Sequence, residues 1–438
     1  MRRRSRLVVG VVAALLAIPG GAGGAAPPHG ARAAGGPDFQ VSGGSADEDD
    51  LDPAVAWNAT NNQYLVVWQD ARDAATRGDD IYGQRLSGTG AALGSNFRIS
   101  GASATERDWS PAVVWNQTSN EYLVAWQDDR NYAAGKGFDI YGQRISAAGV
   151  PVGSNFRVTD LLHSGSYAPA LAWNQTNNEY LVVWHDGRSY ASRFNDIYGQ
   201  RVSAAGVALG GNFRVSGPSA LKDDLNAAVA LNQANNQYLV VWGDARGPAA
   251  TRGVDIYGQR VWAGGALAGG NFRISGDSAA RDDTYPAIAW GQTSGQYLVV
   301  WDDWRFSYTR RIEIYGQRVW AGGALAGGNF RISGADATHD ESHPAVAWNS
   351  TNNRYLVVWY DGRNLLAARG WDIFGQKVAG GGTLVGTNFR ICGPNATADE
   401  WDPAVAWDQT AGEFLVVWED ERSELTRGLD IFGQRVAG

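Results

Sequence analysis

The sequence predicts an all-β fold, a seven-bladed β-propeller with four antiparallel strands per blade, on three observations. The phrase DPAVAWN at residues 52–58 returns six times in related form, with starts 58 or 59 residues apart. Each copy is followed by further apolar segments of near-constant sequence, separated by Gly, Asn, Ser and Asp. The last copy lacks its fourth segment, and a matching one, DFQVSG at 38–43, precedes the first copy. A fixed period of this size indicates a repeat architecture.

The four segments of a unit are predicted to be strands. The second, at residues 64–68 in unit one, is rich in β-branched and aromatic residues and is apolar on both faces, as a strand between two sheets should be. The fourth, at 97–99, alternates apolar and charged residues, which suits an outer strand with one wet face. The Asn-rich link NATNNQ between the first and second strands is typical of a tight hairpin.

Ring closure follows from the offset of the repeat at the two ends of the chain. An open solenoid gains nothing from a strand displaced to the N-terminus. In a ring, the strand at 38–43 completes the seventh blade, so both ends are held and no long strand edge is left open. We therefore predict one propeller domain over residues 35–438.

The motifs YLVVWxDxR, DIYGQR and NFRIS, spread over residues 38–438, resemble the repeat arrays of secreted bacterial β-propeller proteins of TolB-like and WD40-like architecture. The resemblance implies the fold and transfers no functional residue. The chain lacks the SxDxGxxW box of sialidases, the paired Gly-His and Trp-Asp of true WD40 repeats, and YWTD. Propellers serve as binding platforms, adhesins and enzymes, so function must be argued from the site.

Residues 1–34 are predicted to be a secretory signal peptide and linker. A basic start, an apolar run of about a dozen residues and then small residues follow in the order that export requires. The expected location is therefore extracellular or periplasmic. Cys392 is the single cysteine, so no internal disulfide is possible. A net charge of -8 argues against nucleic acid as a partner, and no later stretch is long and apolar enough for membrane insertion.

Ligand binding is expected on the face that carries the loops between second and third strands and between blades. The third-to-fourth link has ten residues in all six complete cases, whereas the second-to-third link varies between 11 and 12. Variable loops on a rigid scaffold are where binding is usually located. Exposed-looking aromatic residues in these loops are candidates for stacking on sugar rings. They are Trp109, Tyr132, Tyr190, Trp304, Tyr308, Trp371 and Trp401.

The motif WxDxR recurs in all seven units, which favours a structural role over a catalytic one. An Asp can accept backbone N–H bonds in a turn, and an Arg offers a planar donor fork to a carboxylate, with the aspartate of DIYGQR (Asp80 in unit one) as its expected partner. These residues are predicted to fasten the second-to-third loops. They are Asp70, Arg72, Asp128, Arg130, Asp186, Arg188, Asp244, Arg246, Asp303, Arg305, Asp361, Arg363, Asp420 and Arg422.

Residues that break the sevenfold pattern are the place to look for catalysis, and none is assigned from sequence. His339 and His343 lie four apart, in what we expect to be a surface loop without a zinc motif. His185 and Glu313 are single replacements at tolerant positions. The acid run 47–52 could bind calcium but lacks the ordered spacing of a calcium loop, so it is expected to be solvated, and no cofactor is predicted.

The leading functional expectation is a secreted, monomeric, non-enzymatic propeller that binds a polysaccharide or a protein through the variable-loop face. One alternative is a glycan hydrolase or lyase on the same ring, which would need paired carboxylates in a central cleft. Another is a structural surface or matrix component. Two close, desolvated acids on the propeller axis would exclude the binding-only interpretation.

Overall fold

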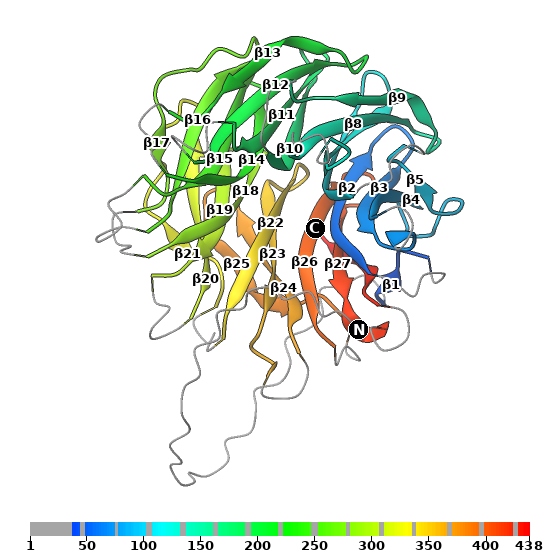
Figure 1. Cartoon of the computed structure of the whole chain (residues 1–438). Helices are drawn as coiled ribbons and strands as arrows, with labels where there is room; N and C mark the ends of the chain where they lie inside the picture. Colours follow the sequence, from blue (N-terminus) through cyan, green and yellow to red (C-terminus); the bar gives the residue numbers. More distant parts are fainter. Residues whose placement is uncertain are drawn as a thin grey trace, which may run out of the picture. The chain divides into compact units, whose positions relative to one another are not determined.

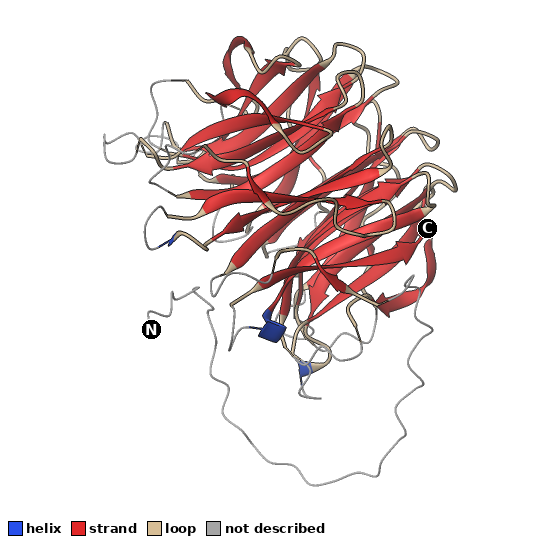
Figure 2. Cartoon of the chain, turned by 90° about the vertical axis from the view of Figure 1, so that its right-hand side faces the viewer, coloured by secondary structure: helices blue, strands red, loops and turns tan. Residues whose placement is uncertain are grey.

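The computed structural model describes residues 37–43, 49–74, 78–101, 107–131, 137–160, 165–188, 194–217, 222–246, 253–276, 281–305, 311–334, 339–365, 370–393, 398–423 and 428–438. Strands dominate these residues (Figure 2). They form seven four-stranded antiparallel sheets, one per sequence repeat, which confirms the predicted seven-bladed propeller. The predicted signal segment 1–34 lies outside the described residues.

Each blade follows the chain from the propeller axis outwards. The first strands are β2 (Asp50–Asn58), β6 (Asp108–Asn116), β10 (Ser166–Asn174), β14 (Asp224–Asn232), β18 (Asp283–Gly291), β22 (Glu341–Asn349) and β26 (Glu400–Asp408). The second strands are β3 (Gln63–Asp70), β7 (Glu121–Asp128), β11 (Glu179–Asp186), β15 (Gln237–Asp244), β19 (Gln296–Asp303), β23 (Arg354–Asp361) and β27 (Glu413–Asp420). A 3-10 helix, η3 (Glu421–Ser423), follows β27.

The third strands are β4 (Asp80–Ser87), β8 (Asp139–Ser146), β12 (Asp196–Ser203), β16 (Asp255–Trp262), β20 (Glu313–Trp320), β24 (Asp372–Ala379) and β28 (Asp430–Ala437). The fourth strands differ in length. They have seven residues in β9 (Pro151–Arg157), β13 (Ala208–Arg214) and β25 (Leu384–Arg390), and two in β1 (Phe39–Gln40), β5 (Phe97–Arg98), β17 (Phe272–Arg273) and β21 (Phe330–Arg331).

The ring closes as predicted, with β1 pairing antiparallel to β28 in the seventh blade. Phe39 lies opposite Gly433, and the backbone N–H of Val41 donates to the carbonyl of Ile431 at 2.7 Å. Figure 1 shows blue β1 beside the red C-terminal strands. The N-terminal strand therefore supplies the hydrogen bonds that the outer edge of β28 would otherwise lack.

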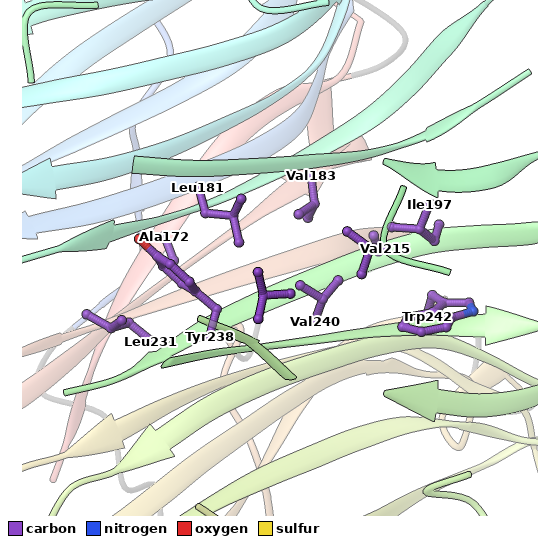
Figure 3. Close-up of a cluster of buried hydrophobic side chains, with 11 residues drawn as sticks. Ala172, Leu181, Val183, Ile197, Val215, Leu231, Tyr238, Val240 and Trp242 are labelled. Atoms are coloured by element: carbon purple, nitrogen blue, oxygen red, sulfur yellow. The ribbon is translucent and has the colours of Figure 1, made fainter. Parts of the chain in front are cut away.

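The core lies between adjacent blades, because the second strand of every blade is buried on both faces. Trp68 and the six equivalent tryptophans are fully buried. Between blades 3 and 4, for example, Leu181 and Val183 pack against Tyr238, Val240 and Trp242 (Figure 3). The β-branched and aromatic composition of YLVVW is thus explained by packing on two neighbouring sheets.

Each first strand contains a β-bulge near its start. In β2 the register with β3 shifts between Leu51 and Ala54, and Asp52 at the bulge has a φ of 51°. The equivalent residues of the other blades all have φ between 45° and 55°. A bulge that places a non-glycine residue in the left-handed region re-aims its side chain at an energetic cost. Here it directs seven side chains towards the axis.

Two faces of the ring are distinguished below. The pocket face is where first strands begin and second strands end, as at Asp50 and Asp70. The turn face is the opposite one, with the hairpins between first and second strands and the links between third and fourth strands. Among the described residues, no helix is long and apolar enough to cross a membrane.

Candidate functional site

An axial pocket of about 390 Å³ opens at the start of the seven first strands. Every blade contributes its bulge residue and the residue after it, which is proline in all blades except the fourth. The bulge residues form a ring: Asp52, Ser110, Ala168, Asn226, Tyr285, His343 and Asp402. The scaffold is repeated seven times, but the chemistry that it directs into the pocket differs from blade to blade.

A second variable set stands behind this ring, at the position that follows the buried tryptophan of each second strand. It comprises Gln69, Gln127, His185, Gly243, Asp302, Tyr360 and Glu419. Three of these side chains accept the backbone N–H of the bulge residue in the next blade. Glu419 binds Asp52 at 2.7 Å, Gln127 binds Ala168 at 3.0 Å and Asp302 binds His343 at 3.0 Å. The second set therefore holds the backbone of the first.

The acidic part of the pocket is where blades 7 and 1 meet. Carboxylate oxygens of Asp52, Asp402 and Glu419 lie within 4.8 Å of one another. Glu419 is fully buried, whereas Asp52 and Asp402 line the pocket and are partly exposed. Ser110 Oγ donates to Asp52 Oδ2 at 3.3 Å from the neighbouring blade. Carboxylate oxygens are also preferred Ca²⁺ ligands, so these three residues could hold a cation.

An aromatic wall adjoins these acids on blades 5 and 6. The ring centroids of Tyr285 and His343 are 3.9 Å apart, and His343 Nε2 lies 3.8 Å from Asp402 Oδ1. Behind His343, the ring of Tyr360 stacks at 5.2 Å. Burial raises the pKa of Asp302 well above its usual range, although Ser342 and the His343 backbone donate to it. The pocket is thus acidic and aromatic on one side and lined by Ser110, Ala168 and Asn226 on the other.

The four predicted aromatic candidates that the structure describes do not all come together. Trp371 and Trp401 come together, with centroids 5.3 Å apart, and Trp401 lies 5.0 Å from Tyr360, so they extend the aromatic wall outwards. Trp109 is in β6, where its Nε1 donates to Asp79 at 2.7 Å. Trp304, directly after β19, is 36% exposed.

Tyr132, Tyr190 and Tyr308 lie outside the described residues.

The WxDxR residues form the same clamp in all seven blades. The Asp accepts the backbone N–H of the Arg at 2.8 to 3.0 Å. The Arg side-chain Nε donates to the same carboxylate at 2.7 to 2.9 Å. The guanidinium lies 3.7 to 4.1 Å from the centre of the aromatic ring in DIYGQR or DIFGQR. The partner of Arg72 is therefore Asp70 itself, whereas Asp80 pairs with Arg98 at 3.3 Å.

A buried acid on the first strand stands opposite each clamp in six blades. Burial, and then the charge of Asp70, raise the pKa of Asp50 well above its usual range. In blade 4 the same causes raise the pKa of Asp224 to about 9. Blade 3 has Ser166 at this position. There, although burial opposes ionisation, the hydrogen bonds and charge of Arg188 hold the pKa of Asp186 below its usual value.

A second group of possible metal ligands, Asp372 and Cys392 of blade 6 and Glu400 of blade 7, is buried. Arg390 Nε lies 2.8 Å from Asp372 Oδ1 and 3.2 Å from Cys392 Sγ. The guanidinium already supplies the positive charge that a metal would bring. This group is therefore an ion-paired cluster of the protein core. Cys392, the single cysteine, occupies the position that Ser100 has in blade 1.

Two expectations about pattern-breaking residues were wrong. His343 belongs to β22 and lines the pocket, whereas we expected a surface loop. The described part of the acid run 47–52, residues 49–52, is not simply solvated, because Asp50 is buried and hydrogen-bonded to Trp68, and Asp52 lies in the pocket.

The signal that could have found the pocket was present in the sequence. In a repeat that is otherwise nearly constant, the residue directly before PAVAW or its variant changes from unit to unit. It is D, S, A, N, Y, H and D in units one to seven. Both errors arose because the β-bulge extends the first strand by about two residues beyond the constant motif.

Comparison with solved structures places the chain among β-propellers. An α-L-arabinofuranosidase of Fusarium graminearum, solved with arabinobiose, is similar with a TM-score of 0.52 and 11% identity, over 74% of this chain and 93% of that one. An α-L-arabinanase of Penicillium chrysogenum with arabinobiose gives 0.51 and 11%, over 92% and 98%. A protein of unknown function from Dyadobacter fermentans gives 0.51 and 11%, over 77% and 97%. At this identity the likeness shows the fold alone.

No family model matches the chain, and no curated protein does.

Proposed function

We propose that the protein is a glycan hydrolase whose axial pocket cleaves a glycosidic bond. The observation that carries the proposal is the cluster of Asp52, Asp402 and Glu419, whose carboxylate oxygens lie within 4.8 Å at the wall of the pocket. Glycoside hydrolysis uses a pair of carboxyl groups that flank the scissile bond. The fungal neighbours with arabinobiose, an arabinose disaccharide, agree with a carbohydrate as the ligand.

The pair in contact with substrate is Asp52 and Asp402, because both line the pocket while Glu419 is buried behind them. Their separation is nearer to the roughly 5 Å of retaining enzymes than to the wider spacing that leaves room for water in inverting ones. Asp402, beside the ring of His343 at 3.8 Å, is the proposed nucleophile. Asp52 is then the acid and base, and Glu419 positions it through the 2.7 Å bond to its backbone N–H.

The aromatic wall gives the pocket a surface for sugar binding. Tyr285, 41% exposed, presents its ring beside His343 and next to the acids. Ser110 and Asn226 on the other side can hydrogen-bond sugar hydroxyls. A binding-only propeller would have no need for three clustered carboxylates at its axis, and this is why we prefer hydrolysis to the non-enzymatic alternative.

The proposal is tested by incubating the purified protein with a panel of polysaccharides that includes arabinan, and by measuring both retention and reducing-end release. Asp402→Asn and Asp52→Asn should each lower release by at least about 100-fold while retention persists, since the loss of a nucleophile or acid acts on chemistry. Ala168→Ser, at the same ring position without a carboxylate, is the matched control and should remain active.

Retention without any cleavage would replace hydrolysis by the binding function. Neither retention nor cleavage across the panel would overturn both.

Export is part of the proposal, on the basis of the basic and then apolar N-terminal sequence. Expression of the full chain in a bacterium, with N-terminal sequencing of protein from the medium or periplasm, tests it. Full-length protein confined to the cytoplasm would contradict it.

A further inference from the structure

The turn face of blades 4 to 6 carries positive charge without compensating acids. Its hairpins and links comprise residues 232–237, 260–271, 291–296, 318–329, 349–354 and 377–388, all of them described. The only charged side chains in these segments are Arg260, Arg318, Arg354 and Lys377. Among the described residues, no Asp or Glu side chain forms an ion pair with these four cations, and Lys377 Nζ donates to an oxygen of Gly438 at 3.2 Å. The whole chain, in contrast, has a net charge of -8.

Blades 2, 3 and 7 neutralise the equivalent arginine with a glutamate on the second strand. The pairs are Arg144 with Glu121 at 2.8 Å, Arg201 with Glu179 at 2.7 Å and Arg435 with Glu413 at 2.7 Å. In blades 4 and 5 a glutamine stands in place of the glutamate. Arg260 lies 3.5 Å from Gln237 Oε1, and Arg318 lies 3.0 Å from Gln296 Oε1. In blade 6 an arginine, Arg354, stands there, and burial of Lys377, followed by the charge of Arg354, lowers the pKa of Lys377.

Exposed apolar side chains also occur on the outer links of blades 2 and 3, at Val150 and Val207, but the exposed tryptophans of the turn face, among the described residues, lie beside these cations. Trp262 and Trp320, at the ends of the third strands of blades 4 and 5, are 46% and 47% exposed, where blades 1 to 3 have serine. Leu325 and Leu384, on the outer links of blades 5 and 6, are 44% and 39% exposed.

The register of the strands places these residues in two mixed grooves. Side chains two residues apart on a strand share a face, so Arg260 and Trp262 both face blade 5. Gly323 is in the outer link of blade 5, and a Cβ added to it would lie 3.0 Å from Arg260 Nε. The outer link of blade 5 therefore packs against Arg260. Leu325 pairs with Val319, so the two side chains share a face of blade 5. Val319 is next to Trp320 in the strand and therefore points to the opposite face. Leu325 thus faces blade 4. One groove therefore combines Arg260, Trp262 and Leu325.

The groove between blades 5 and 6 repeats this arrangement with Arg318, Trp320 and Leu384. Leu384 pairs with Val378, and a Cβ on Gly382 would lie 2.6 Å from Arg318 Nε. We call these six residues of the two adjacent grooves the Trp–Arg patch.

We propose that the Trp–Arg patch docks the protein on an anionic lipid membrane surface. Cations without acidic partners are attracted to anionic headgroups, at about 1 kcal/mol for each Lys or Arg near the surface. Trp rings favour the headgroup level, and leucines gain from burial in the acyl boundary. The partner is lipid and not glycan because the indole N–H groups of Trp262 and Trp320 are the only side-chain polar groups in residues 262–270 and 320–328, and they offer sugar hydroxyls no acceptor.

A second copy of the chain is a poorer occupant of this surface. A twofold interface built on the Trp–Arg patch would bring four arginines together without an acid between them. The turn face is also opposite the axial pocket, so docking would leave the pocket open to solvent. The proposal is thus independent of what the pocket does.

The experiment is vesicle co-sedimentation of the purified protein with phosphatidylcholine containing phosphatidylglycerol, and with phosphatidylcholine alone. We expect binding to the anionic vesicles that weakens with salt and is lost on neutral ones. The variant Gln237→Glu/Gln296→Glu adds the glutamate that other blades carry and neutralises Arg260 and Arg318. It should weaken binding at least about tenfold. Each neutralised cation is worth about 1 kcal/mol, which corresponds to roughly a fivefold change in affinity.

Gln63→Glu is the matched control, because Arg85 of blade 1 also contacts a glutamine, at 3.5 Å, but Ser87 and Pro151 occupy the positions of Trp262 and Leu325. It should bind like the parent protein. Trp262→Ser/Trp320→Ser, which installs the serine of blades 1 to 3, should lower binding while its melting temperature confirms folding.

Four results would overturn the proposal, three of them in binding assays and one in the oligomeric state. The binding results are equal binding to neutral vesicles, unchanged binding of the Gln237→Glu/Gln296→Glu variant, and retention on soluble polygalacturonate without retention on anionic vesicles. The last would assign the patch to an anionic glycan. Concentration-dependent dimerisation that is lost in the Trp262→Ser/Trp320→Ser variant, without vesicle binding, would assign it to a second copy.

Discussion

Asp224 is a fully buried acid whose carboxyl group lies against that of Asp244. Burial and the neighbouring charge raise its pKa to about 9, so the folded protein holds a proton that the unfolded chain releases near pH 4. A carboxyl group whose pKa is raised by folding contributes stability that is fully present below the pKa of the unfolded chain. This contribution is lost as the pH rises towards 9, the pKa in the folded protein. At alkaline pH this residue therefore works against folding.

Asp224→Ser, which copies Ser166 of blade 3, removes this pH dependence. We expect the variant to gain stability relative to the parent by about 2 kcal/mol or more between pH 5 and pH 9, because a pKa change of one unit is worth about 1.4 kcal/mol. Thermal unfolding of both proteins across that range measures the difference. Asp186→Ser in blade 3 is the contrasting control, since the pKa of Asp186 is lowered and its loss should destabilise at neutral pH. A constant difference between parent and Asp224→Ser at all pH values would contradict the argument.

At this scale, the repeated residues were predictable from the sequence, whereas the variable ones were missed. Sevenfold recurrence pointed to Asp70 and Arg72 as a pair of structural interest, and in the structure they touch each other. His343 and Asp52 were passed over because their neighbours in sequence look like a loop. Only the bulge, which sets φ near 50° and points both side chains to the axis, brings them together. That convergence depends on closing the ring and is not visible in any single repeat.

At the scale of the element, the clamp holds each second strand to the segment that follows it. The Asp70 carboxylate accepts bonds from Trp68 Nε1, the Arg72 backbone and the Arg72 guanidinium. The guanidinium also covers the ring of Tyr82 on the third strand, at 4.0 Å. One carboxylate therefore ties the end of β3 to β4 and satisfies a buried indole.

Asp70→Ala should lower the free energy of unfolding by about 1 to 3 kcal/mol, the cost of leaving buried donors without an acceptor. Denaturant unfolding of Asp70→Ala, Arg72→Ala and the double variant measures the coupling between the two residues. Activity in the axial pocket should be unchanged, since neither residue lines it. Full stability of Asp70→Ala together with loss of glycan binding would return these residues to a functional role.

The strands themselves were predicted well, because the period-two and apolar patterns are strong and are repeated seven times. Their lengths were less predictable. The outer strand has seven residues in β9 but two in β5, although both repeats read SNFR, and the difference lies in the preceding residues Pro151-Val152 and Ala92-Leu93. Pairing at the outer edge depends on such contacts with the link, which local propensity does not encode.

At the scale of the whole molecule, the two faces carry different chemistry. The pocket face gathers Asp52, Asp402 and the aromatic wall at the axis, and the turn face of blades 4 to 6 gathers cations and tryptophans at the rim. Because neither set contributes to the packing between second strands, both can vary while the scaffold stays constant. A protein docked through the turn face would present its pocket away from the surface.

The ring depends on a strand that is far from its partner in sequence. The backbone of β1 pairs with β28, and the side-chain amide of Gln40 donates a hydrogen bond to Asp430 at 2.8 Å. Asp38, directly before β1, forms an ion pair with Arg422 at 2.8 Å. Without β1, the outer edge of β28 would be open to pairing with another chain. Val41 would also leave the core between blades 7 and 1.

Deletion of residues 1–43 should therefore lower the melting temperature by at least about 5 °C, corresponding to a few kcal/mol, and produce concentration-dependent association. Deletion of residues 1–36, which retains β1, is the matched control and should behave as a stable propeller. Differential scanning calorimetry and light scattering over a range of concentrations measure both effects. If the two deletions melt alike and remain equally dispersed, closure through β1 contributes little, and the packing of the seven blades alone holds the ring.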